Sequence, residues 1–276
     1  MSTHRSSRLL RALSAIEAPY LGGWCHLPGS FSAEIIASAG FDWCCVDRQH
    51  GMIDEGSLFD MVRVLDLAGT PPLVRVSSSD PYEIGRALDA GARGVIVPVI
   101  RSVAEAERAA SACRFASEGI RSWATTRLKL RQAVPDPLAV NDSTVCLVMI
   151  ETREGLRDVS AIAELPGVDG LFVGPADLRL ELDLDAEGLR EACRAVVEAC
   201  RANGKVAAVF AGGSEHVQDW FAQGFELIAI DSDSVLLLAA ARDAVAAARS
   251  AIAPATQASS AADDSQVASL KPGGGP

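Results

Sequence analysis

The stretch Gly170-Leu171-Phe172-Val173-Gly174-Pro175-Ala176-Asp177-Leu178 is a short apolar run that changes abruptly into a polar turn. An apolar run of this length bounded by turn residues is typical of a strand that is buried on both faces. Polar groups placed where such a strand ends are frequently binding or catalytic groups. This stretch predicts both a buried parallel strand and a functional edge of the sheet.

The same pattern recurs along the chain, because eight apolar runs alternate with segments of helical period. The runs are Leu21 to Cys25, Trp43 to Val46, Pro72 to Val76, Gly94 to Val97, Cys146 to Ile150, Gly170 to Val173, Val206 to Phe210 and Leu227 to Ile230. Eight strand-helix units in about 250 residues are typical of a closed (β/α)8 TIM barrel, an α/β fold. A doubly wound open sheet is the alternative fold.

The two ends of the chain depart from this repeat. Ser2 to Glu17 mixes arginines with leucines and lacks the continuous apolar core of a signal peptide, which predicts a short amphipathic capping helix. Residues 253–276 lack the apolar periodicity that offsets the entropy of ordering, which predicts a disordered tail. We therefore expect one barrel domain over residues 1–252 and a tail over residues 253–276.

Composition excludes several classes of function. The formal net charge of −11 gives no basic footprint for a nucleic acid. No stretch reaches the 18 or so uninterrupted apolar residues of a membrane span. The seven cysteines form no Cys-x-x-Cys pair and no even framework, which predicts a reduced cytoplasmic protein.

Four polar patches follow strands two, three, five and six of the predicted barrel: Asp47 to Gly51, Val74 to Val76, Met149 to Thr152 and Gly174 to Leu178. The C-terminal ends of barrel strands meet at one mouth, where the active sites of this fold lie. The patches are therefore expected to converge although they are far apart in the sequence.

Two carboxylates, Glu151 and Asp177, follow adjacent strands. Oxygen ligands placed in this way suit a divalent cation and leave positions for water and substrate. The alternative is that both acids belong to helix N-termini, where negative charge is common.

Arg75 lies inside an apolar run, where an unpaired guanidinium would be costly to bury. A fixed cation at a strand end suits a developing oxyanion. Alternatively, Arg75 forms a buried salt bridge with Glu151 or Asp47 that only stiffens the barrel.

Among the four histidines, His50 follows a strand and has an acid, Asp47, three positions earlier. That spacing predicts a proton-transfer histidine with an orienting carboxylate, against the alternative of a structural loop histidine. His26 follows the first strand beside Trp24 and is expected only to line the pocket.

In the long connection from Phe115 to Thr144, Arg121 either reaches over the mouth or is a solvated loop residue.

Taken together, these patches resemble the HpcH/HpaI aldolase family over about Leu21 to Arg249. The segments that carry the resemblance are Gly40 to Gly51, Leu88 to Pro98, Ile150 to Thr152 and Pro166 to Leu178. The resemblance implies a metal-dependent class II pyruvate aldolase. Gln49 stands where the family often has glutamate, so recognition of the acceptor aldehyde is expected to differ.

Carried over residue by residue, the resemblance implies that Glu151 and Asp177 bind Mg²⁺, Mn²⁺ or Co²⁺. Pyruvate would chelate this metal, with its carboxylate on the backbone amides of Ala176 and Asp177. Arg75 would stabilise the enolate.

The resemblance also implies that His50, oriented by Asp47, serves proton transfer, and that Trp24 is a pocket wall. The family implies a homo-oligomer, typically a hexamer that exchanges the last barrel helix between subunits, and the apolar segment from Val235 to Ala248 is compatible with that exchange.

The resulting hypothesis is a lyase that cleaves 4-hydroxy-2-oxo acids to pyruvate and an aldehyde, or runs the reverse. One alternative keeps the enolate but forms it by decarboxylating oxaloacetate, as macrophomate-synthase-like relatives do. The other alternative is a catalytically silent oligomeric barrel in which Arg75 and the acids are structural ion pairs.

Overall fold

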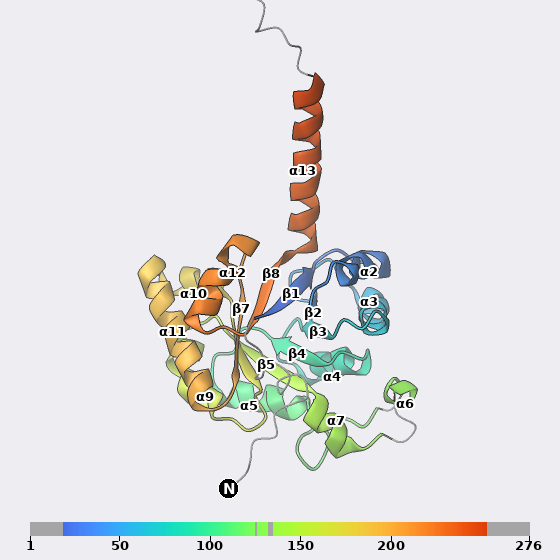
Figure 1. Cartoon of the computed structure of the whole chain (residues 1–276). Coiled ribbons are helices and arrows are strands. Elements are labelled where there is room, and N and C mark those ends of the chain that lie inside the picture. The colour runs from blue at the N-terminus through green and yellow to red at the C-terminus, as the bar shows by residue number, and fades with distance from the viewer. Residues whose placement is uncertain (1–18, 125, 132–134, 253–276) are drawn as a thin grey trace, which may run out of the picture. The chain divides into compact units, whose positions relative to one another are not determined.

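The eight predicted strands close into a parallel barrel in sequence order, β1 to β8 (Figure 1). The computed structural model describes residues 19–124, 126–131 and 135–252. The strands are β1 (Tyr20–Cys25), β2 (Trp43–Asp47), β3 (Pro72–Arg75), β4 (Gly94–Val97), β5 (Val145–Ile150), β6 (Gly170–Val173), β7 (Val206–Phe210) and β8 (Leu227–Ser232). Because β1 pairs with β8, the barrel is confirmed and the open sheet is wrong.

Helices follow the strands, and those between β1 and β8 surround the barrel (Figure 1). They are α2 (Ser30–Ser38), α3 (Glu55–Leu67), α4 (Pro81–Asp89), α5 (Val103–Ala112), α6 (Leu128–Arg131), α7 (Pro137–Ser143), α8 (Arg153–Arg157), α9 (Val159–Ala163), α10 (Pro175–Leu182), α11 (Ala186–Ala202), the 3-10 turn η1 (Ser214–His216), α12 (Val217–Gln223) and α13 (Asp233–Ile252). Side-chain caps define several starts; Asp80, for example, accepts from Tyr82 N at 2.7 Å and precedes Pro81.

Strand side chains alternate between two buried layers. The layer inside the barrel includes Trp24, Trp43, Cys45 and Met149. Their strand neighbours pack in a larger layer between the barrel and its helices. Because side chains of a strand alternate with a period of two, the next inward position after Met149 is Glu151. Alternation therefore carries the polar residues at the strand ends into the mouth.

The predicted N-terminal helix over Ser2 to Glu17 and the predicted tail over residues 253–276 lie outside the described residues. Contacts divide the chain into two compact units, residues 1–235 and 236–276, and every barrel strand belongs to the first. The single-domain assignment of residues 1–252 stays a prediction. Among the described helices, none is long and apolar enough to cross a membrane.

Candidate active site

A cavity of about 340 Å³ opens among residues at the C-terminal ends of the strands and in the turns that follow. Of the residues predicted for the site, it is lined by Trp24, His50, Arg75, Ala176 and Asp177. Convergence of the polar patches at one mouth is thus found. The aromatic rings of Phe172 and Phe210 complete an apolar wall.

Arg75 and Asp47 form a buried two-pronged ion pair at the mouth. The register of β2 and β3 sets the two residues side by side. Arg75 Nε donates to Asp47 Oδ1 at 2.9 Å, and Arg75 Nη2 donates to Oδ2 at 2.5 Å. The pair uses two of the three guanidinium nitrogens, so Nη1 is left for another partner. The salt bridge expected as one alternative for Arg75 exists, on a side chain that also lines the cavity.

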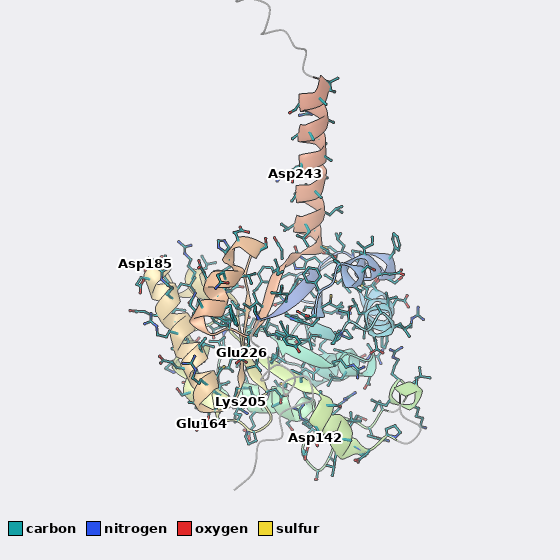
Figure 2. The ribbon with its side chains drawn as sticks, in the orientation of Figure 1. Asp142, Glu164, Asp185, Lys205, Glu226 and Asp243 are labelled. Atoms are coloured by element: carbon teal, nitrogen blue, oxygen red, sulfur yellow. The ribbon has the colours of Figure 1, made fainter. Side chains whose placement is uncertain are left out.

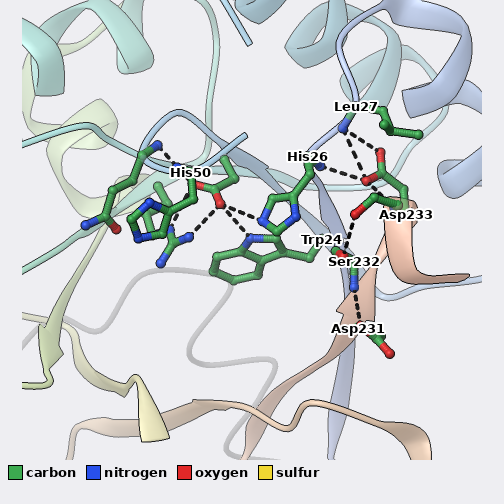
Figure 3. Close-up of polar contacts among 11 residues, drawn as sticks. Trp24, His26, Leu27, His50, Asp231, Ser232 and Asp233 are labelled. Carbon is green, nitrogen blue, oxygen red and sulfur yellow. Dashed lines mark hydrogen bonds and ion pairs between the residues drawn. The ribbon is translucent and has the colours of Figure 1, made fainter. Parts of the chain in front are cut away.

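Asp47 collects further donors around its carboxylate. Trp24 Nε1 donates to Oδ2 at 3.1 Å, and His26 Nε2 lies 2.8 Å from the same oxygen (Figure 3). Burial alone would raise the pKa of Asp47. The contacts with His26 and Arg75, together with the charge of Arg75, outweigh burial and hold that pKa well below its ordinary value. Asp47 is therefore a permanent anion at the mouth.

The partner of Asp47 differs from the one expected from the sequence. Asp47 Oδ1 accepts from the backbone N–H of His50 at 3.3 Å, and no contact with the His50 ring is found among the described residues. The imidazole beside the carboxylate is that of His26. Sequence spacing misled because an acid three positions before a residue readily caps the backbone of the turn.

A strand signal would have pointed to His26. Trp24 is buried inside the barrel, and His26 lies two positions further along the same line. The period of two therefore aims both side chains inward, and His26 does line the cavity.

Aromatic contacts fix the indole of Trp24 as a wall of the cavity. Its ring packs against Phe172 at 5.6 Å and against Phe210 at 5.3 Å between centroids. The Arg75 guanidinium carbon lies 5.1 Å from the indole centroid. This cation–π contact further restrains the guanidinium that the cavity exposes.

Glu151, directly after β5, is a buried carboxylate with one oxygen already bonded. Its Oε1 accepts from Val99 N at 2.7 Å, and Val99 has the left-handed backbone conformation (φ 56°) that is unusual for a β-branched residue. Burial raises the pKa of Glu151, and the negative charge of Asp177 adds to this. Two interacting negative charges, one of them lining the cavity, favour a bound cation.

Close packing explains the glycine opposite Glu151. The register of β5 and β6 pairs Ile150 with Val173, so Glu151 lies beside Gly174. A Cβ on Gly174 would lie 2.6 Å from Glu151 Oε2. A side chain at this position would have to displace the second carboxylate oxygen from its place.

Asp177 lies in the first turn of α10, as the helix-terminus alternative expected, and its residue is exposed to the cavity. The helix has no side-chain cap, and its first intrahelical hydrogen bond runs from Leu178 N to Gly174 O. The N–H groups of Ala176 and Asp177 precede that bond, so they have no acceptor in the helix. Helix N-termini with N–H groups of this kind favour negatively charged ligands.

Arg121 is absent from the cavity lining, contrary to the expectation that it reaches over the mouth. Its guanidinium is buried and donates to Asp89 Oδ1 at 2.9 Å. It also lies 4.4 Å from the ring centroid of Phe115. Asp89 ends α4, near the start of β4, so Arg121 supports the opposite end of the barrel.

Two carboxylates, a fixed guanidinium and a helix N-terminus at the C-terminal mouth of the barrel are the arrangement expected of a TIM-barrel enzyme. The model of the HpcH/HpaI aldolase/citrate lyase family matches residues 22–241. The chain belongs to this family, and it is a lyase.

Named relatives agree with this membership. The chain is 37% identical over 234 residues to a hydroxypyruvate/pyruvate aldolase of Rhizorhabdus wittichii, covering 83% of this chain and 93% of that protein. It is 32% identical over 230 residues to a 4-hydroxy-2-oxo-heptane-1,7-dioate aldolase of Salmonella arizonae, covering 81% and 88%. The crystal structure of an HpcH/HpaI aldolase/citrate lyase family protein from Burkholderia cenocepacia superposes with a TM-score of 0.81 at 31% identity, covering 88% of this chain and all of that one.

Proposed function

We propose that the protein cleaves a 4-hydroxy-2-oxo acid to pyruvate and an aldehyde by a divalent-metal-dependent retro-aldol reaction, and that it also runs the reverse. One observation carries this proposal: Arg75 and Asp177 line one small cavity, and Glu151 lies directly behind Gly174 of its wall, where it interacts electrostatically with both. The relatives named as pyruvate and hydroxy-oxo-acid aldolases support the same reaction class.

Glu151 and Asp177 fit a divalent cation. The second oxygen of Glu151 faces the space that a Cβ on Gly174 would fill, and the nearby charge of Asp177 has no basic partner in any described contact. Within the described part of the chain, no cluster of three or more acids, histidines or cysteines is arranged to hold a metal ion. Two carboxylates that leave positions for water and substrate suit Mg²⁺, Mn²⁺ or Co²⁺. The cation would supply Lewis-acid stabilisation of negative charge on the keto oxygen.

The N-terminus of α10 binds the carboxylate of the oxo acid. The free N–H groups of Ala176 and Asp177 point their donors at an anion, and the helix dipole favours the same charge. Arg75 lines the same cavity of about 340 Å³, so an oxo acid bound there has its neighbouring keto group within reach of the guanidinium.

Arg75 stabilises the oxyanion that develops as the carbon–carbon bond breaks. Its Nη1 is not used by Asp47, and the pair with Asp47 and the stacking on Trp24 hold the guanidinium in place before substrate arrives. A donor that is preorganised in this way contributes about 10²- to 10³-fold to the rate.

His50 removes the proton of the aldol hydroxyl. Its ring lines the cavity, and its backbone N–H is held by Asp47, which anchors the turn that carries the ring. An imidazole is suited to this step because its ordinary pKa lies near neutrality.

The test is exchange of the methyl protons of pyruvate with deuterated water, followed by NMR. Wild-type protein with Mg²⁺ or Mn²⁺ should exchange the methyl group, and a chelator should abolish exchange. Glu151→Gln should be inactive with an unchanged unfolding temperature, whereas Glu164→Gln, at an exposed acid, should match wild type (Figure 2). Wild type that is inert towards pyruvate, 4-hydroxy-2-oxo acids and oxaloacetate would overturn the proposal, as would full turnover by Glu151→Gln.

A further inference from the structure

His26 is held from two sides at the mouth (Figure 3). On the ring side, its Nε2 lies 2.8 Å from Asp47 Oδ2. On the backbone side, His26 N donates to Asp233 Oδ1 at 2.8 Å, and Leu27 N donates to Asp233 Oδ2 at 3.1 Å. Asp233 is itself buried at the start of α13. Both the ring and the main chain of His26 are thus fixed by carboxylates.

The ring of His26 and the carboxylate of Asp47 are in close polar contact. Nε2 is buried and has no partner in straight hydrogen-bond geometry, although it lies within contact distance of Oδ2. The side chain is 29% exposed and lines the cavity, so part of the ring is open to a ligand. An imidazole that has one nitrogen on a carboxylate keeps the other nitrogen, Nδ1, for proton exchange.

Two histidines of different character therefore share the cavity. The ring of His26 is oriented by Asp47, whereas Asp47 reaches only the backbone of His50. Aldol cleavage needs two proton transfers, one from the hydroxyl oxygen and one to the carbon of the enolate. Two acid–base groups with separate placements match those two needs.

The shared oxygen of Asp47 relates His26 to the oxyanion site. Arg75 Nη2 and His26 Nε2 contact the same atom, Asp47 Oδ2, at 2.5 and 2.8 Å. The guanidinium and the imidazole are therefore neighbours across that oxygen. A substrate whose keto oxygen binds Arg75 would therefore place its adjacent carbon in the part of the cavity that His26 also lines.

We propose that His26 transfers the proton at the carbon next to the keto group, while His50 serves the hydroxyl. In methyl exchange, the C–H bond breaks, its electron pair stays on the substrate as the enolate, and the proton goes to His26. The imidazolium exchanges with solvent and returns a deuteron to the carbon, which restores the ketone. This inference rests on the proposed function and divides its acid–base work between two residues.

Methyl exchange separates the two steps because it involves the carbon proton and no hydroxyl. His26→Gln should lower the exchange rate by about 10²- to 10⁴-fold, since glutamine keeps an N–H near the position of Nε2 but carries no exchangeable acid–base nitrogen. His50→Gln should retain methyl exchange and lose cleavage of the 4-hydroxy-2-oxo acid. His216→Gln, at an exposed histidine, should match wild type in both assays.

The outcomes distinguish this inference from the proposed function. Wild type that exchanges pyruvate, together with His26→Gln that exchanges equally well, would show that His26 only supports Asp47 and would overturn this inference alone. An inert wild type would overturn the proposed function and this inference with it. Loss of exchange in His26→Gln with an unchanged unfolding temperature and a normal KM would support the assignment.

A second readout does not depend on turnover. In protein labelled with ¹⁵N at its four histidines, the His26 ring should hold its proton on Nε2, and this preference should vanish in Asp47→Asn. The charged groups around His26 are Asp47 on β2, Arg75 on β3 across Asp47, and Asp233 at the start of α13. A tautomer ratio that is the same in wild type and Asp47→Asn would contradict the assignment.

Discussion

The two ends of the barrel each bury an arginine–aspartate pair, and the two pairs are used differently. At the mouth, Arg75 binds Asp47 with two nitrogens, and the guanidinium lines a cavity. At the base, where the strands begin, Arg114 Nη2 donates to Asp169 Oδ2 at 2.8 Å. Both pairs are almost inaccessible to solvent, with exposed fractions of 0–9% for every residue involved.

The Arg114–Asp169 pair at the base of the barrel lies among main-chain groups on several sides. Asp169 Oδ2 also accepts from Cys146 N at 2.7 Å, which ties the start of β5 to the residue before β6. Lys205, labelled in Figure 2, precedes β7 and donates its Nζ to Leu165 O at 3.0 Å and Val168 O at 2.6 Å. Asp169 and Lys205 thus bind backbone groups of the chain itself.

The difference separates a structural from a functional ion pair. The Arg114–Asp169 pair is surrounded by backbone contacts and holds the strands in place, as is usual for the N-terminal face of this fold. The Arg75–Asp47 pair lies beside a cavity and leaves one guanidinium nitrogen available for a ligand. Burial alone does not reveal which role a pair has, whereas the remaining partners of its atoms do.

The largest expected effect comes from replacing each arginine by lysine. Arg75→Lys keeps the charge but loses the two-pronged geometry, so methyl exchange should fall by about 10²- to 10³-fold with a small change in stability. Arg114→Lys should retain the exchange rate and lower the free energy of unfolding by about 1–3 kcal/mol. Exchange kinetics and urea unfolding measure both. Equal losses of activity in the two variants would break the comparison.

Two glycines offer a second matched pair. Gly174→Ala crowds Glu151 Oε2 and should weaken Mn²⁺ binding by about 10- to 100-fold, measured by calorimetric titration. Gly170→Ala at the base places a Cβ 2.6 Å from Val206 O, and should lower stability by about 1–3 kcal/mol while cation affinity persists. Unchanged Mn²⁺ affinity in Gly174→Ala would contradict the role given to Glu151.

A divalent cation should stabilise the protein only through the acids at the mouth of the barrel, so a change at the opposite end should not alter this stabilisation. Mn²⁺ at a hundredfold excess over its Kd should raise the free energy of unfolding of wild type and Arg114→Lys by about 2.7 kcal/mol. Because burial, and then the charge of Asp177, raise the pKa of Glu151, protons compete with the cation as the pH falls. The stabilisation should therefore weaken on acidification, and Glu151→Gln should show none. Thermal unfolding with and without Mn²⁺ at several pH values provides the measurement.

The smallest expected effect is on the acid side of the stability curve. The pKa of Asp47 is lower in the folded protein than in the unfolded chain, so the unfolded chain takes up the proton first as the pH falls. The stability contributed by Asp47 is thus complete above the ordinary aspartate pKa of about 3.9 and is lost below it. Urea unfolding from neutral to acidic pH should give a shallower acid slope for Asp47→Asn than for the surface variant Asp219→Asn. Identical slopes in the two variants would show that Asp47 does not contribute to the loss of stability in acid.

Local sequence signals predicted the barrel well because strand length and apolar runs are local properties. Four of the eight predicted strands differ from the structure only by a residue at one end, and β8 continues to Ser232. The convergence of strand ends at one mouth also predicted that Arg75 and Asp177 face a common cavity. The partner of Asp47 was not predictable from spacing within one segment, since the contact with His26 depends on the pairing of β1 with β2. Arg121 was misplaced because its pair with Asp89 forms only when the long connection folds back.

The hydrogen bond from His26 to Asp233 also has a consequence for synthesis of the protein. The two residues are 207 positions apart, and they become neighbours only when β8 closes against β1. A nascent chain in which β8 has not yet left the ribosome lacks both the closure and this backbone anchor of His26. A chain truncated before residue 233 would keep the contact of His26 with Asp47 but lose the carboxylate that holds its main chain.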